Sequence, residues 1–264
     1  MHSPPPHAAP TPLDGMTAVV TGASSGIGRA IALELASAGA DVFVHAKANG
    51  EGAEETKASV QRIGRSSHFV LADISDPQQA SALVESAFSW RKDIAIWVNC
   101  AGVDVLTGDA QNWSFEEKIS ALWQADVRGT IQLSREVGRR MRETKVSGAT
   151  ILNIGWDQAE LGMAGDSGEM FAAVKGAIMV FTRSLAKSLA PDVRVNCLAP
   201  GWIKTAWGDA ASDSWQDRAR SESLLARWGT PEDVARAARF LVSPDAEFIN
   251  GQVISVNGGM DTSG

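Results

Sequence analysis

The chain has 264 residues, of which 44% are hydrophobic and 21% are charged, a composition typical of a globular protein. The net charge is −7 and no run is rich in lysine or arginine, so we do not expect the protein to bind nucleic acid. Two cysteines make no disulfide framework, no histidine and cysteine spacing resembles a metal site, and no apolar run is long enough for a membrane span. We therefore expect a cytoplasmic protein that binds neither a metal nor a membrane.

The beginning of the chain, residues 1–12, contains five of the ten prolines. It lacks the apolar core and the charge cluster of a secretory signal, so we predict a disordered tail. Residues 13–264 show no internal repeat and no second domain, and we predict that they form a single domain.

Short apolar runs predict strands at Met16–Val20, Val42–Val44, Phe69–Leu71, Ile94–Val98, Thr150–Ile154, Val193–Leu198 and Val253–Val256. Between them, helical spacing predicts a helix that contains Ile27, Ile31 and Leu35 and ends at Gly39, and further helices at Glu51–Ile63, Pro77–Phe88, Phe115–Met141 (with an early break), Glu169–Leu189 and Pro231–Leu241. Residues 201–229 are predicted to be irregular or to form short helices. This alternation indicates an α/β fold, a doubly wound, Rossmann-type parallel sheet with helices on both faces.

A glycine-rich loop, Thr21–Gly28, leaves the first strand and opens the first helix. Glycine allows backbone amides to approach a ligand, and a helix N-terminus offers free N–H groups and positive dipole density to a pyrophosphate. We expect the cofactor to contact Gly22, Ser24, Ser25, Gly26, Ile27 and Gly28.

The spacing G-x-x-x-G-x-G resembles that of the short-chain dehydrogenase/reductase family, and further motifs follow in the family's order from about Gly15 to Gly259. They are Ala72-Asp73-Ile74, Asn99-Cys100-Ala101-Gly102, Phe171-Ala-Ala-Val-Lys175, the segment Asn196–Thr205 and Asn257-Gly258-Gly259. The length and the closing segments most resemble the 3-oxoacyl-acyl-carrier-protein reductases. The resemblance adds these expected cofactor contacts: Asp73, Ile74, Asn99, Ala101, Gly102, Lys175, Pro200, Gly201, Ile203 and Thr205.

The choice of nicotinamide depends on the end of the second strand, where an acidic residue would bind the ribose 2′-OH. That position is Ala46, and Lys47 follows it. A missing carboxylate beside a cation favours NADP, with NAD as the alternative, although Lys47 could also be a solvated surface lysine. Arg29 is a second candidate for the extra phosphate.

The catalytic pattern of the family is mostly lost. The resemblance implies that Tyr protonates the carbonyl oxygen, Lys holds the ribose, Ser orients the carbonyl and Asn anchors a water. The chain has no tyrosine; Phe171 occupies the Tyr position, Trp156 the Ser position and Asp126 the Asn position. Only Lys175 matches, and its spacing of four from Phe171 places both on one helix face.

Another acid could replace the tyrosine. Asp157 follows Trp156 directly and could carry a proton if burial raised its pKa, whereas Asp126 could pair with Lys175. Asp166 and Glu169 are further candidates, but acidic residues also favour a helix N-terminus for structural reasons.

Five tryptophans, at positions 156, 202, 207, 215 and 228, lie in or near segments that cover the substrate in the family. They could pack a mobile substrate loop or form an aromatic pocket.

Three functions stay open: an NADP-dependent oxidoreductase with an atypical proton donor, a nicotinamide-binding sensor or inactive subunit, and non-redox chemistry on the same scaffold. The expected partner is a small molecule, an acyl thioester or an apolar ketone. The resemblance also implies a homodimer or homotetramer that associates through the helices at Phe115–Met141 and Glu169–Leu189.

Overall fold

The computed structural model describes residues 11–260 and contains a seven-stranded sheet in the order β3-β2-β1-β4-β5-β6-β7. All neighbouring strands are parallel, so the predicted doubly wound sheet is confirmed. The strands are β1 Thr17–Val20, β2 Asp41–Ala46, β3 Ser67–Leu71, β4 Ile94–Asn99, β5 Thr150–Ile154, β6 Arg194–Pro200 and β7 Val253–Val256. The strand order reverses between β1 and β4, and ligands of such sheets bind at that point, beyond the carboxyl ends of the strands.

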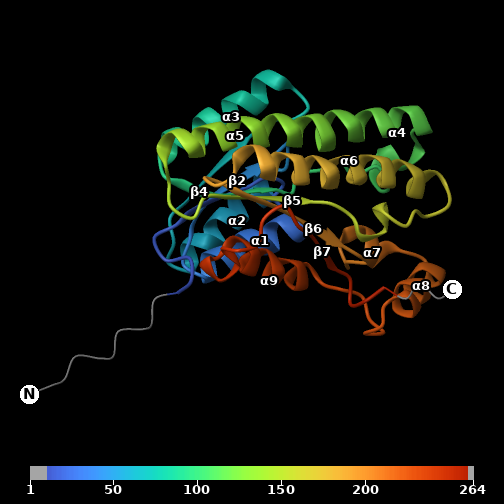
Figure 1. Ribbon diagram of the computed structural model, residues 1–264. Coiled ribbons are helices and arrows are strands. Elements are labelled where there is room, and N and C mark those ends of the chain that lie inside the picture. The colour runs from blue at the N-terminus through green and yellow to red at the C-terminus, as the bar shows by residue number, and fades with distance from the viewer. Residues whose placement is uncertain (1–10, 261–264) are drawn as a thin grey trace, which may run out of the picture.

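Helices cover both faces of the sheet (Figure 1). They are α1 Gly26–Ser37, α2 Gly50–Arg62, α3 Pro77–Trp90, α4 Phe115–Leu122, α5 Thr130–Thr144, α6 Asp166–Leu189, α7 Ala206–Ala210, α8 Asp213–Glu222 and α9 Pro231–Val242. Helices α1, α2 and α9 pack on one face, and α3, α5 and α6 pack on the other. Each layer has its own cluster of fully buried side chains, for example Leu35 and Leu241 on one side and Leu133 and Ile151 on the other.

Most of the predicted tail, residues 1–10, lies outside the described residues. Thr11 and Pro12 belong to a turn, because the Thr11 carbonyl accepts a hydrogen bond from the Asp14 N–H at 3.0 Å. The side chain of Leu13 is fully buried. Thr11 and Pro12, which the prediction assigned to the tail, are thus part of a hydrogen-bonded turn.

The predicted long helix from Phe115 is interrupted by a π-helical segment, Trp123–Gly129, between α4 and α5. Such wide turns inside helices are rare and frequently occur at functional sites. Here the wide turn carries Asp126, whose side chain is only 2% exposed.

Helix α6 begins at Asp166, three residues earlier than predicted, after Gly165 with a φ of +92°. Asp166 and Glu169 both lie in its first turn and are exposed. They therefore fit the structural alternative, in which carboxylates stabilise a helix N-terminus.

The segment 201–229 contains the two short helices α7 and α8, which lie beyond the ends of β6 and β7 (Figure 1). Its two ends are joined, because the Gly229 N–H donates to the Trp202 carbonyl at 2.9 Å. Near its end it also pairs with the C-terminal part of the described chain, where the Leu224 N–H donates to the Gly259 carbonyl at 2.8 Å. This segment is thus fixed at several points by backbone hydrogen bonds.

Candidate active site

A cavity of about 750 Å³ opens at the carboxyl ends of the strands. With the single exception of Asn99, the residues expected to bind the cofactor line it: Gly22, Ser24, Ser25, Gly26, Ile27, Gly28, Lys47, Asp73, Ile74, Ala101, Gly102, Lys175, Pro200, Gly201, Ile203 and Thr205. Trp156 and Phe171 line the same cavity.

The glycine loop forms a cradle with no room for side chains. A Cβ on Gly22, which has a φ of +68°, would lie 2.7 Å from Ala101 Cα, and one on Gly28 would lie 2.2 Å from the Gly22 carbonyl oxygen. At the start of α1, the Ser25 side chain makes no capping hydrogen bond to the first turn. The free N–H groups of that turn meet the cavity, so the chemistry of this cradle fits a pyrophosphate.

Two side chains that the sequence reasoning missed fix the cradle. Thr21 Oγ1 accepts hydrogen bonds from the N–H groups of Cys100 and Ala101, each at 3.0 Å. The Gly22 N–H donates to His45 Nδ1 at 3.4 Å, and His45 Nε2 lies 2.9 Å from the Ala72 carbonyl oxygen. Burial lowers the pKa of His45, so a neutral ring with its proton on Nε2 satisfies both contacts. A polar residue within an otherwise apolar strand was the available signal for His45.

Asn99 departs from its predicted role. It accepts a hydrogen bond from Trp97 Nε1 and donates one to Asn153 Oδ1, both at 2.9 Å. Its amide is buried between β4 and β5 and joins the two strands instead of facing the cavity.

The two cations considered for NADP recognition both have acidic partners. Lys47 Nζ lies 2.7 Å from Asp73 Oδ2, and Arg29 forms two hydrogen bonds with Glu55, at 2.7 and 2.9 Å. Burial alone would raise the pKa of Asp73, but hydrogen bonds from Lys47 and Ser75 outweigh it and hold that pKa below its usual value. Of the two cations, only Lys47 lines the cavity.

Lys175 and Asp126 form a direct ion pair, with 2.8 Å between Nζ and Oδ2. The second carboxylate oxygen accepts a hydrogen bond from the Val103 N–H at 2.9 Å. Burial acts to lower the pKa of Lys175, yet the Asp126 carboxylate outweighs this effect and the pKa is raised, so the ammonium form persists. Gly102 makes room for the pair, because a Cβ there would lie 2.9 Å from Asp126 Oδ2.

Aromatic rings occupy the two positions that the family resemblance assigns to Tyr and Ser. The rings of Trp156 and Phe171 contact each other edge to face, with 6.3 Å between centroids. Ser167, one turn before Phe171 on α6, also lines the cavity and was not predicted. Cys100 lines it too, but burial raises the pKa of its thiol to about 12, so it carries no thiolate at neutral pH.

Asp157 is not among the residues that line the cavity, and its role as a proton donor stays a prediction. Its Oδ2 accepts a hydrogen bond from Asn257 Nδ2 at 3.0 Å, and its Oδ1 is buried without a hydrogen-bond partner. Burial raises the pKa of this carboxyl to about 6. Asp157 packs against Gly201, which lines the cavity: a Cβ on Gly201 would lie 2.8 Å from Asp157 Oδ2.

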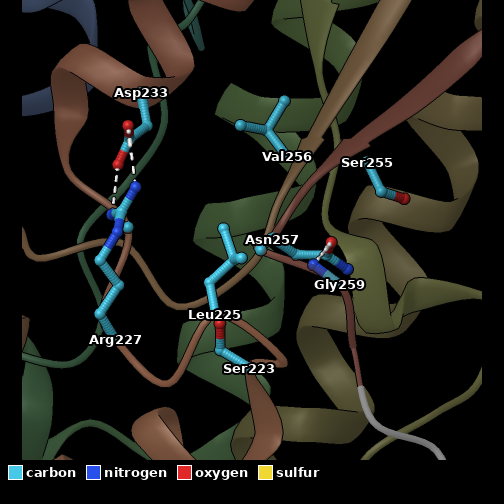
Figure 2. Close-up of a pocket in the computed structure, with 10 residues that line it drawn as sticks. Ser223, Leu225, Arg227, Asp233, Ser255, Val256, Asn257 and Gly259 are labelled. Atoms are coloured by element: carbon cyan, nitrogen blue, oxygen red, sulfur yellow. Dashed lines mark hydrogen bonds and ion pairs between the residues drawn. The ribbon is translucent and has the colours of Figure 1, made fainter.

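Asn257 also lines a second, smaller cavity of about 290 Å³ (Figure 2). Arg227 and Asp233 form an ion pair in the lining of this cavity, with 2.7 Å between Nη1 and Oδ2. Asn257 accepts a hydrogen bond from the Gly259 N–H at 3.1 Å, so this residue connects the small cavity with Asp157.

Four of the five tryptophans form one cluster, with ring centroids between 5.4 and 6.2 Å apart: Trp202, Trp207, Trp215 and Trp228. Trp202 Nε1 donates to Glu222 at 2.7 Å, and Arg218 binds the same carboxylate at 2.6 Å. Trp228 is buried, whereas the other three line the cavity.

Comparison with known proteins places this geometry in a family. A family model described as enoyl-(acyl carrier protein) reductase matches residues 22–261. The 3-oxoacyl-[acyl-carrier-protein] reductase of Aquifex aeolicus is 34% identical over 94% of this chain and 98% of its own length. A short-chain type dehydrogenase/reductase of Picea abies is 33% identical over 94% of this chain and 93% of its own. The chain belongs to the short-chain dehydrogenase/reductase family of oxidoreductases.

Solved structures of this family agree with the fold. A short-chain dehydrogenase from Burkholderia cenocepacia J2315, solved in complex with NADP, has a TM-score of 0.83 and 32% identity, over 94% of this chain and 98% of that one.

Two further features of this short-chain dehydrogenase/reductase concern membranes and metals. Among the helices of residues 11–260, none combines the length and apolar character needed to cross a bilayer. The same residues hold no group of three or more histidine, cysteine, aspartate or glutamate side chains arranged for a metal ion.

Proposed function

We propose that the protein is an NADP-dependent oxidoreductase that interconverts a carbonyl and an alcohol, built like a 3-oxoacyl-[acyl-carrier-protein] reductase but working without the family's tyrosine. The observation that carries this proposal is the Lys175–Asp126 pair, with its ammonium at the wall of the same cavity as the glycine cradle. NADP is favoured because Lys47 stands at this cavity without an acidic residue at position 46. The Burkholderia relative was solved with the same nucleotide.

A bound nicotinamide would supply the hydride, and the protein has to stabilise the oxygen on which negative charge develops. We assign this role to the Lys175 ammonium, because Asp157 and Asp126 do not line the cavity. Asp126 keeps Lys175 charged and fixes its position. The proton that completes the alcohol comes from Nζ, and solvent then restores the ammonium.

Removal of the ammonium should be far more damaging than loss of its partner. In Lys175→Met we expect turnover to fall by about 10²-fold or more, the range typical of a positioned acid. In Asp126→Asn the pKa of Lys175 loses the support of the carboxylate and falls, so the high-pH limit of activity should shift downward. Asp157→Asn is the control: if it abolishes turnover while Lys175→Met does not, the assignment of the proton donor is wrong.

The rings of Trp156 and Phe171 favour a second function, because they stand where the usual site of the family has two hydroxyl groups. On this alternative the protein binds the nicotinamide as a sensor or as an inactive subunit. Titration with NADPH and NADH, followed by NADPH oxidation with an acetoacetyl thioester and simple ketones, separates the two. Tight binding without turnover of any of them supports the alternative, whereas failure to bind either nucleotide contradicts both functions.

A further inference from the structure

The far end of the cavity from the nucleotide cradle is built mostly from flat side chains. Five rings line it, from Trp156, Phe171, Trp202, Trp207 and Trp215. They come from the end of β5, from α6 and from the segment 201–229. This composition presents broad ring surfaces to whatever occupies the cavity beside Lys175.

The ring surface is held rigidly before any ligand arrives. The guanidinium of Arg218 lies over Trp215 at 5.0 Å and over Trp202 at 5.6 Å from the ring centroids, and it binds Glu222 on its other side. Trp228 packs behind Trp202 and Trp207, with centroids 6.2 Å from each. The segment is also joined at both ends by backbone hydrogen bonds, so these rings form a wall that contacts inside the protein hold in place.

The charged side chains at this end of the cavity already have polar partners within the protein. Lys175 is paired with Asp126, and Asp104 accepts hydrogen bonds from the N–H groups of Leu106 and Thr107 at 2.9 and 3.0 Å. Among the described residues that line this end, no other lysine or arginine is present to receive a carboxylate or phosphate. The wall therefore favours an uncharged ligand.

We propose that the substrate is an uncharged ketone or alcohol carried on a flat, fused or aromatic ring system, which stacks on the tryptophan wall. Flat rings gain offset-stacked or edge-to-face contacts with Trp beyond the area they bury, and a rigid ligand loses little conformational entropy in a rigid site. A flexible acyl chain gains burial alone and loses rotational freedom. This proposal rests on the proposed function, because it names the substrate class of the same site.

The test compares binding of ring ketones with that of open-chain ketones of equal carbon number, to protein saturated with NADP⁺ so that no turnover occurs. The pairs are α-tetralone with methyl octyl ketone, and fluorenone with dihexyl ketone, measured by calorimetry. We expect the ring compound of each pair to bind more tightly. In Trp207→Leu and Trp215→Leu its affinity should fall roughly three- to tenfold for each ring removed, while open-chain affinity changes less. Trp113→Leu is the matched control, since Trp113 is 41% exposed and lies outside the cavity lining.

Equal or weaker binding of both ring ketones, or binding that neither tryptophan variant affects, would overturn the proposal. The same titrations without nucleotide, together with NADP⁺ binding by each variant, keep the outcomes separate. Failure of NADP⁺ to bind counts against the proposed function, whereas the preference between ring and chain is still measured on the free protein. Unchanged NADP⁺ affinity in Trp207→Leu and Trp215→Leu shows that these variants are folded.

Discussion

At the scale of single residues, we propose that the site differs from an ordinary member of its family at two rings and one carboxylate. Phe171 and Trp156 stand where the family resemblance places hydroxyl groups, and Asp126 pairs directly with Lys175. On this proposal the difference concerns proton transfer and carbonyl orientation, while the glycine cradle is retained.

Restoring both hydroxyl groups should restore the usual chemistry. In the double variant Phe171→Tyr, Trp156→Ser we expect turnover of acetoacetyl thioesters to rise by about 10²-fold or more, because a positioned general acid contributes that much. Steady-state NADPH oxidation measures it, and each single variant serves as a control. A double variant that binds NADPH normally and shows no gain would mean that these two rings do not limit the reaction.

The buried carboxyl of Asp157 should destabilise the folded protein at neutral pH. Its pKa is raised to about 6, so the folded state binds more protons than the unfolded state between the usual aspartate pKa and 6, and stability falls as pH rises through this window. Asp157→Asn should remove this fall and stabilise the protein at pH 7 by at most about 3 kcal/mol. Urea unfolding at pH 4.5 and 7 measures both, with the exposed Asp93→Asn as the control. An unchanged pH profile in Asp157→Asn would contradict the raised pKa.

At the scale of elements, the ends of helices and one π-helical turn position the side chains of the site. The π-helical turn presents Asp126 to Lys175, and the start of α9 borders the small cavity. Glycine-loop chemistry and apolar runs predicted the strands, the first helix and the cradle. A break in the helix from Phe115 was expected, but its π-helical form and the inward amide of Asn99 were not predictable, because they depend on contacts between residues far apart in the chain. The orientation of Asp157 was not predictable either, because it is set by Asn257, a hundred residues away.

The capping box of α9 should contribute measurably to stability. Thr230 Oγ1 accepts from the Asp233 N–H, and Asp233 accepts from the Thr230 N–H in return. Thr230→Ala should cost about 1 kcal/mol in the free energy of unfolding. Ser212→Ala is the matched control, because Ser212 stands at the N-cap of α8 without a side-chain capping bond. Equal losses in the two variants would contradict this role of the cap.

At the scale of the whole molecule, the cavity touches almost every strand end of the sheet, so its occupation should stabilise the entire domain. NADPH at a hundred times its dissociation constant should add about 2.7 kcal/mol and raise the Tm by roughly 5–10 °C. Thermal unfolding with NADPH and with NADH measures this without any turnover. An unchanged Tm with both nucleotides would mean that the glycine cradle does not bind them.

Lys47 sets the preference between the two nucleotides in this scheme. Lys47→Glu places two carboxylates beside the expected 2′-phosphate, because Asp73 is already 2.7 Å from Lys47 Nζ. Because this change reverses one charge beside the phosphate, NADPH affinity should fall by roughly tenfold or more. NADH, which lacks that phosphate, should lose little affinity. Equal losses for both nucleotides would remove Lys47 from cofactor recognition.

His45, whose imidazole accepts the Gly22 N–H, should make the glycine cradle sensitive to acid. Burial lowers the pKa of His45 in the folded protein, while the unfolded chain has a value of about 6.5. Between these two pKa values the unfolded chain binds the extra proton, so the folded protein loses stability as the pH falls through this window. A protonated ring has no lone pair for the Gly22 N–H, so protonation of His45 breaks that contact. We therefore expect acid to weaken nucleotide binding by loosening the turn at Gly22.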